Sequence, residues 1–292
     1  MSAHTPMISG TTRLGGLIGS PVAHSLSPLM HNYSFARLGI DRIYLCFEAA
    51  PDELSGCVRG LKALGAYGFN LTMPHKQAVL EYLDEVTEAA RLTGAVNTVA
   101  IEDGRLIGYN TDGIGYMQCA KDAGFEAGGQ VMTLLGAGGA AHAIAIQAAL
   151  DGLSVLHVCA RRSASWAKAA ALVDTINRET SCRADLTDLQ DQESLRRHLQ
   201  ESRLLTNATS AGMKPHEDEL PLPDPDLMHP GLIVSDVIYE PQETRLLSEA
   251  KARGCTTFNG LYMLLYQGAE AFRIWCGRDM PVEEVRALLA QG

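Results

Sequence analysis

The segment "GAGGAA" (136–141) constrains the fold most strongly, because it joins the apolar run "VMTLL" (131–135) to the small, apolar run "AHAIAIQAAL" (141–150). A glycine-rich turn between a strand and a helix is typical of dinucleotide-binding folds, where the pyrophosphate meets the helix N-terminus. Gly136 and Gly138, with Ala141, fit the spacing G-x-G-x-x-[GA]. We therefore predict a dinucleotide site here; a turn without a ligand is the alternative. The expected cofactor contacts are Gly136, Ala137, Gly138, Gly139 and Ala140.

The residues that follow alternate between strand and helix patterns, which predicts a doubly wound parallel sheet with helices on both faces. The expected strands span 131–135, 154–160, 182–187, 204–208 and 232–239, and the expected helices span 139–151, 164–178, 190–201 and 242–253. The proline-rich, acidic segment 215–231 is predicted to be a surface loop.

The first part of the chain shows a second alternation, with strands expected at 14–19, 42–49 and 67–73 and helices at 27–39 and 51–65. Residues 95–112 are typical of a hairpin that turns at Asp103-Gly104. Segment 256–260 precedes two further helices, at 261–276 and 281–290. We predict an α/β protein whose first domain (1–112) is completed by 258–292, with a Rossmann-type domain at 113–257.

Composition narrows the function classes for this chain of 292 residues. A formal net charge of −10 without a basic run makes nucleic acid and anionic membranes poor partners. The seven cysteines are scattered without a CxxC pair, which favours buried thiols in a reducing compartment. The N-terminal "MSAHTPMISGTTR" does not fit a signal peptide, and no apolar run reaches the roughly 18 residues of a membrane span. We expect a cytoplasmic protein; its oligomeric state, a homodimer included, stays open.

The end of the second strand of the glycine-turn domain indicates which dinucleotide binds. An acid about 20 residues past the glycines usually binds a free ribose 2′-hydroxyl. Here the strand ends in "ARRSAS" (160–165), so Arg161, Arg162 and Ser163 are available for a 2′-phosphate instead. This pattern predicts NADP; a solvated basic turn is the alternative.

Four polar clusters in the first half follow apolar elements: "HSLSP" (24–28), "NLTMPHK" (70–76), "GAVNT" (94–98) and "GYNTDG" (108–113). Ligands of α/β folds bind at such strand ends, and these groups suit a small polyhydroxylated acid. Lys76 is a candidate proton donor for a carbonyl under reduction, and Asp112 is a candidate to orient it. A surface lysine is the alternative.

These clusters, together with "HSLSPLMHN", "FNLTMPHK", "GAGGAA", "TNATSAGMKP" and "NGLYMLLYQGAEAF", resemble the shikimate/quinate dehydrogenase family, in order and over nearly the whole chain. "MPHK", "GMKP" and "LLYQGAEAF" are most similar to the bacterial quinate/shikimate dehydrogenase branch. The resemblance implies a two-domain oxidoreductase that interconverts 3-dehydroshikimate and shikimate with NADP(H), and quinate with NAD(H) as the alternative.

The resemblance also implies residue roles. Lys76 and Asp112 would carry the acid–base chemistry. Ser25 and Ser27 would bind the substrate carboxylate, although Ser25 also fits a helix cap. Further substrate contacts would come from Tyr44, Thr72, Asn97 and Gln267, and further cofactor contacts from Val237, Tyr239 and Gly260. No metal is expected, because His24, His31 and His75 lack ligand spacing.

Three positions depart from the family pattern. Ala160 replaces a usual asparagine, and Ser163 stands where NAD-using relatives often have an acid, so cofactor preference is in question. Tyr262 replaces a usual glycine, which puts the shape of the substrate pocket in question. The alternatives to an NADP-dependent shikimate dehydrogenase are a catabolic quinate dehydrogenase and a non-catalytic NADP sensor; a sensor would not need the Lys76–Asp112 pair.

Overall fold

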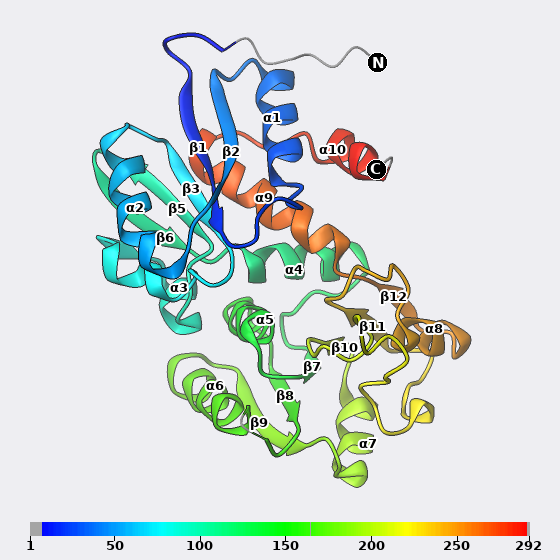
Figure 1. Ribbon diagram of the computed structural model, residues 1–292. Helices are drawn as coiled ribbons and strands as arrows, with labels where there is room; N and C mark the ends of the chain where they lie inside the picture. Colours follow the sequence, from blue (N-terminus) through cyan, green and yellow to red (C-terminus); the bar gives the residue numbers. More distant parts are fainter. Residues whose placement is uncertain (1–7, 164, 291–292) are drawn as a thin grey trace. The chain divides into compact units, whose positions relative to one another are not determined.

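Two sheets, each with its own helices, make up the computed structural model, which describes residues 8–163 and 165–290 (Figure 1). The chain divides into unit 1, residues 1–111 and 265–292, and unit 2, residues 112–264. The first boundary is next to the position that we placed from the sequence. The second lies inside the helix α9 (Leu261–Cys276) rather than at residue 258. Residues 1–7, and Ala164 of a predicted helix, are outside the described residues.

Unit 2 contains an entirely parallel sheet with the strand order β12-β11-β10-β7-β8-β9. This is the order of a doubly wound dinucleotide-binding fold, so the predicted fold class is confirmed. The strands are β7 (Val131–Leu135), β8 (Val155–Ala160), β9 (Arg183–Asp188), β10 (Leu204–Asn207), β11 (Ile233–Asp236) and β12 (Thr256–Phe258). The helices are α4 (Asp112–Asp122), α5 (Gly139–Leu150), α6 (Trp166–Glu179), α7 (Gln192–Glu201) and α8 (Arg245–Ala252).

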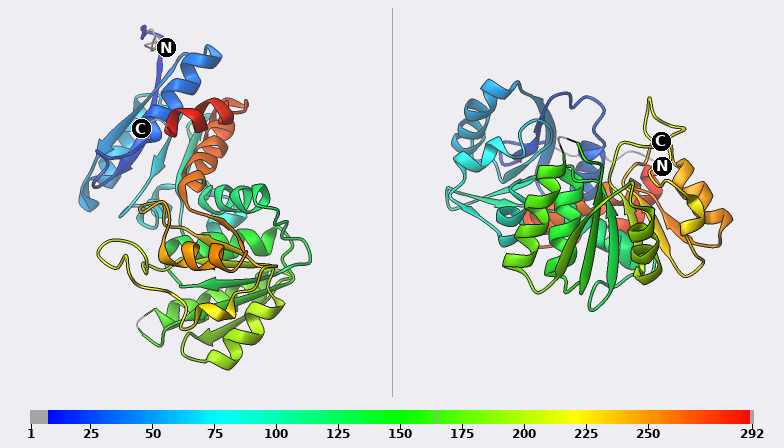
Figure 2. Two further views of the ribbon diagram at one scale, coloured as in Figure 1. Left: turned by 90° about the vertical axis from the view of Figure 1, so that its right-hand side faces the viewer. Right: turned by 90° about the horizontal axis from the view of Figure 1, so that it is seen from below.

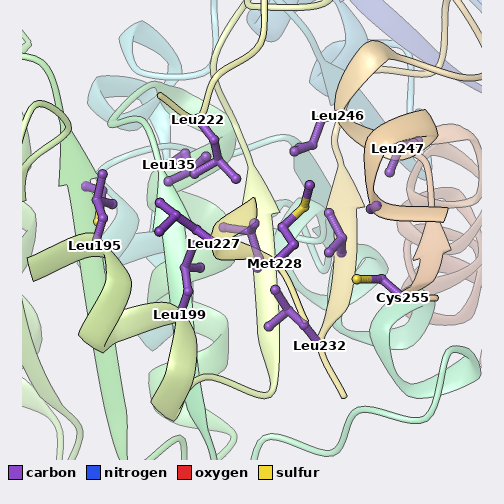
Figure 3. Close-up of a cluster of buried hydrophobic side chains, with 14 residues drawn as sticks. Leu135, Leu195, Leu199, Leu222, Leu227, Met228, Leu232, Leu246, Leu247 and Cys255 are labelled. Carbon is purple, nitrogen blue, oxygen red and sulfur yellow. The ribbon is translucent and has the colours of Figure 1, made fainter. Parts of the chain in front are cut away.

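Apolar strand residues anchor this sheet to its helices, as Figure 3 shows for one cluster of buried side chains. Leu135 of β7 and Leu199 of α7 are both fully buried there. The prediction of a surface loop at 215–231 was wrong in part. Leu222 and Met228 are 3% and 5% exposed within the same cluster, and a 3₁₀ turn, η3 (Pro225–Leu227), lies between them. Burying these side chains removes apolar surface from water, which fixes the ends of an otherwise polar segment.

Unit 1 contains a mixed sheet with the order β2-β1-β3-β5-β6-β4, built on a parallel β2-β1-β3 core. The strands are β1 (Arg13–Gly19), β2 (Arg42–Glu48), β3 (Gly68–Leu71), β4 (Glu85–Val86), β5 (Thr98–Glu102) and β6 (Arg105–Tyr109). The predicted hairpin is confirmed, since β5 and β6 are antiparallel and Asp103 and Gly104 both have positive φ. The helices are α1 (Ser27–Leu38), α2 (Leu54–Ala63), α3 (Glu88–Thr93), α9 and α10 (Val282–Leu289), with 3₁₀ turns η1 (Pro51–Glu53) and η2 (Ala78–Tyr82).

Several element ends differ from the sequence prediction for local reasons. The strand expected at 232–239 stops at Asp236, because the Asp236 carboxylate accepts the Ile238 N–H (3.0 Å) and turns the chain. The helix expected from 242 begins after Thr244, whose hydroxyl accepts the Leu247 N–H (3.4 Å). Helices α3 and α4 were not predicted from the sequence.

Both views in Figure 2 show the parallel strands of unit 2 with helices on either face.

Candidate active site

A cavity of about 680 Å³ lies at the carboxyl ends of the central strands of unit 2. It covers the point between β7 and β10 where the strand order reverses, which is where open α/β sheets bind ligands. Its volume is in the range of ligand sites. The cavity is lined by Gly136, Ala137, Gly138, Ala160, Arg161, Arg162, Ser163, Ser165, Asp188, Leu189, Gln190, Ala208, Thr209 and Ser210.

The two glycines of the turn have different reasons to be glycine. Gly136 has φ +106°, and a Cβ there would lie 2.8 Å from the Ala208 carbonyl oxygen, so the fold itself excludes a side chain. Gly138 has φ −80° as the residue before α5, and a Cβ there would meet nothing within 4 Å. The fold would accept a side chain at position 138. Because glycine has none, the backbone there is open to the cavity. This fits a phosphate at the α5 N-terminus.

The two arginines of the "ARRS" turn both line the cavity but differ in their contacts. Arg162 donates from Nε to Asp188 Oδ2 (3.0 Å), and its guanidinium lies 4.5 Å from the centre of the Trp166 ring. Arg161 makes no ion pair with any described residue, and it also lines a second, smaller cavity with Glu219. Residues 160–165 contain no acid, whereas the neighbouring strand β9 supplies Asp188.

Of the remaining predicted cofactor residues, Gly139 and Ala140 open α5, while Val237, Tyr239 and Gly260 lie beyond β11. This second group is held by the buried carboxylate of Asp236. That carboxylate accepts hydrogen bonds from Asn207 Nδ2 (3.1 Å) and Thr244 Oγ1 (2.8 Å) as well as from Ile238. Burial raises the pKa of Asp236, and these hydrogen bonds oppose the rise. Gly260 donates its N–H to the Ile238 carbonyl (3.2 Å), so the network fixes this segment.

In unit 1, the predicted substrate residue Asn97 is the centre of a buried cluster of neutral groups. Its Nδ2 donates to Thr111 Oγ1 (2.9 Å) and to Gln267 Oε1 (3.3 Å), and its Oδ1 accepts the Thr111 N–H (2.8 Å). Thr98 and Asn70 extend the cluster through Asn70 Nδ2 and Thr98 Oγ1 (2.9 Å). The structure therefore brings Asn97 together with Gln267 of α9, a pair 170 residues apart.

The predicted residue Tyr44 is fully buried, and its hydroxyl donates to Asn70 Oδ1 (2.6 Å). Burial raises its pKa well above the ordinary value, with a hydrogen bond to Ser27 acting in the opposite direction. Tyr44 therefore holds Asn70 and Ser27 from inside the core. The partly exposed Ser25 accepts the Ser27 N–H through its Oγ (3.2 Å), so it does support the start of α1, although Leu26 is the N-cap residue.

The two proposed catalytic residues lie in a loop and at a helix start, respectively. Lys76 follows β3, and its carbonyl accepts the Val96 N–H (2.8 Å), which ties it to the "GAVNT" segment. Thr72, which lies between β3 and Lys76, donates its N–H to the Ile18 carbonyl (3.0 Å) at the end of β1. Asp112 is the first residue of α4, in unit 2. Lys76, Thr72 and Asp112 are all partly exposed.

The structure adds residues that the sequence analysis did not single out. Asn70, Thr98 and Thr111 support the Asn97 cluster, and each lies in one of the four polar segments, so the strand-end signal was already available. Asp188 and Asn207 also end strands, β9 and β10. The parallel register, which pairs Ala160 with Asp188, places Asp188 beside the arginine turn.

One group of possible metal ligands lies elsewhere in unit 2: His157, Asp185 and His198. His157 Nδ1 and Asp185 Oδ2 are 2.8 Å apart, and the two imidazole rings are stacked at 3.7 Å with 22° between their planes. The cluster is thus joined by a hydrogen bond and by ring stacking across β8, β9 and α7. No described helix has the length and apolar character needed to span a membrane.

A doubly wound sheet with a glycine turn at its switch point, joined to a unit with a buried cluster of neutral donors, defines the class of nicotinamide-dependent oxidoreductases. Residues 17–99 match the family described as the shikimate dehydrogenase substrate binding domain, and residues 260–290 match the shikimate 5′-dehydrogenase C-terminal domain. The chain belongs to the shikimate dehydrogenase family.

Individual relatives agree over almost the full length. The chain is 50% identical to the shikimate dehydrogenase (NADP(+)) of Listeria innocua, covering 98% of both chains. It is 43% identical to a quinate/shikimate dehydrogenase of Escherichia coli, covering 98% of this chain and 99% of the relative. The crystal structure of shikimate 5-dehydrogenase from Listeria monocytogenes in complex with shikimate and NAD superimposes with a TM-score of 0.95, at 50% identity over 98% and 99% of the two chains.

Proposed function

We propose that this protein is a shikimate dehydrogenase that reduces 3-dehydroshikimate to shikimate with NADPH, reversibly. The observation that carries the proposal is 50% identity over 98% of both chains with a relative named as the NADP(+)-dependent enzyme. In this proposal unit 1 binds the substrate and unit 2 binds the cofactor. Support comes from the substrate-domain match at 17–99 and from the cavity beside the glycine turn.

In this proposal, different residues transfer the proton, orient the proton donor and bind the substrate. A bound nicotinamide cofactor would supply the hydride for the carbonyl carbon. Lys76 donates a proton to the oxygen as its negative charge develops, and takes that proton back in the reverse direction. Asp112 orients the Lys76 ammonium, and Asn97 with Gln267 holds ring hydroxyls. Ser25 and Ser27 hold the carboxylate, which does not change during the reaction.

The experiment is a steady-state assay of the purified protein with shikimate or quinate, each with NADP⁺ or NAD⁺, followed by the absorbance of the reduced nicotinamide. We expect the highest kcat/KM with shikimate and NADP⁺. A protein that binds NADP⁺ without turning over either acid would contradict the proposal and favour a regulatory NADP-binding module.

Quinate oxidation with NAD⁺ is the second candidate, and the 43% identity with a quinate/shikimate dehydrogenase favours it. Quinate has one more hydroxyl, on the carbon that bears the carboxylate, so the discriminating side chains are those near Ser25 and Ser27. The same assay decides between the candidates through the ratio of kcat/KM for the two acids.

A further inference from the structure

The cofactor cavity contains an acid that the arginine turn itself lacks. Asp188 ends β9, and its register partner in β8 is Ala160, the first residue of the turn. Neighbouring parallel strands are about 4.8 Å apart. Ala160 presents only a methyl group, and both residues line the cavity. The Asp188 carboxylate therefore lies in the cavity beside the end of β8, where NAD-binding folds usually have their acid.

The Asp188 side chain is held in place independently of its arginine partner. Its Oδ1 accepts the Gln190 N–H (3.0 Å), while only Oδ2 accepts from Arg162 (3.0 Å). The Asp188 side chain is 21% exposed, whereas that of Arg162 is 71% exposed. Exposed ion pairs contribute little free energy, so the arginine is the partner that moves. The Gln190 N–H therefore gives the carboxylate an anchor in the cavity that does not depend on Arg162.

Resting on the proposed function, we propose that Asp188 sets the cofactor preference, by accepting a hydrogen bond from the ribose 2′-hydroxyl of NAD and by opposing the 2′-phosphate of NADP. A carboxylate that binds a ribose hydroxyl is the usual device of NAD-binding folds. A 2′-phosphate, by contrast, competes with Asp188 for Arg162 and faces its negative charge. The enzyme thereby accepts NAD despite a turn rich in arginine.

Binding without substrate tests this directly, with Asp188→Asn as the variant and the dissociation constants of NAD⁺ and NADP⁺ as the readout. Asparagine retains an oxygen for the Gln190 N–H but loses the charge. NAD⁺ should bind about 10-fold more weakly, since a charge-assisted hydrogen bond is weakened. NADP⁺ should bind about three-fold more tightly, since one nearby negative charge is removed under screening at moderate salt.

The matched control is Asp174→Asn, which removes the same charge from an exposed position on α6 outside the cavity. It should leave both dissociation constants unchanged. Opposite shifts for the two cofactors in Asp188→Asn alone support the proposal. Shifts in the same direction for both cofactors, or none, overturn it.

A second measurement needs no variant. The unmodified protein should bind 2′-deoxy-NAD⁺ about 10-fold more weakly than NAD⁺, since the ribose donor is gone; equal binding overturns the proposal even if Asp188→Asn fails to fold. Because no substrate is used, the two ideas fail separately. If the two dissociation constants shift in opposite directions but the protein does not turn over shikimate, only the proposed function is contradicted. If the protein turns over shikimate but both dissociation constants shift in the same direction, only the role of Asp188 is contradicted.

Discussion

The Asn97 cluster of unit 1 and the arginine turn of unit 2 represent opposite ways to prepare a binding site. The cluster consists of neutral amides and hydroxyls that are buried and bonded to one another, as the Asn97–Thr111 contact of 2.8 Å shows. The turn consists of charged side chains that are largely exposed, with Arg162 in one ion pair at 3.0 Å. Buried donors keep their geometry before a ligand arrives, whereas exposed charges move to meet it. We therefore expect changes in unit 1 to affect stability and kcat, and changes at the turn to affect cofactor KM.

The largest effect should come from Lys76, which is in unit 1 but acts on the reaction itself. Lys76→Ala should lower kcat by roughly 10²–10⁴-fold, the usual range for a lost general acid, and should weaken shikimate binding less. Lys121→Ala, an exposed lysine on α4, is the control and should leave kcat unchanged. The loss should be largest between about pH 7 and 9, where a general acid contributes most. A near-normal kcat for Lys76→Ala in this range would show that Lys76 is not the general acid.

We expect substitutions in the Asn97 cluster to lower the free energy of unfolding, and substitutions in the arginine turn to leave it nearly unchanged. Asn97→Ala removes the hydrogen bonds from Asn97 to the buried Thr111 and the partly buried Gln267, so the free energy of unfolding should fall by about 2–3 kcal/mol. Chemical denaturation measures this change. Gln118→Ala, exposed on α4, should change the free energy by less than about 0.5 kcal/mol. An unchanged midpoint for Asn97→Ala would mean that the cluster is not preorganised and that the comparison is mistaken.

Ser25 and Ser27 test whether unit 1 also contains purely binding residues. Removing either hydroxyl should raise KM for shikimate by about 10- to 150-fold, which corresponds to a lost hydrogen bond of about 1.5–3 kcal/mol to a charged group. The kcat should be largely kept, because the carboxylate is unchanged during hydride transfer. Ser27→Ala should cost more stability than Ser25→Ala, since Ser27 is buried against Tyr44. Loss of kcat at constant KM would contradict the assignment.

The sequence predicted the structure of the two units to different extents. The sheet of unit 2 was predictable because β7, β8, β10 and β11 each contain a short apolar run. The burial of Leu222 and Met228 was not, since isolated apolar residues among prolines and acids show no period. The roles of Asn97 and Gln267 as substrate contacts came only from family resemblance, and their contact with each other was not predicted, because contacts between distant segments leave no local signal. Asp188 was missed for the same reason: its neighbour Ala160 is across the sheet, not along the chain.

The smallest effect separates the two arginines, which the sequence treated as equivalent. Arg161 has no ion pair to break among the described residues, so Arg161→Ala should raise KM for NADP⁺ about 10-fold by removing a charge-assisted hydrogen bond. Arg162 already donates from Nε to Asp188 and lies over the Trp166 ring, so fewer of its donors are available to a phosphate and Arg162→Ala should raise that KM only about three-fold. KM for NAD⁺ should change little in both variants, and the difference between the two should shrink as salt rises, because exposed charges are screened. Equal effects of the two substitutions would show that Asp188 does not restrain Arg162 when NADP⁺ binds, and the turn would then act as one uniform basic surface.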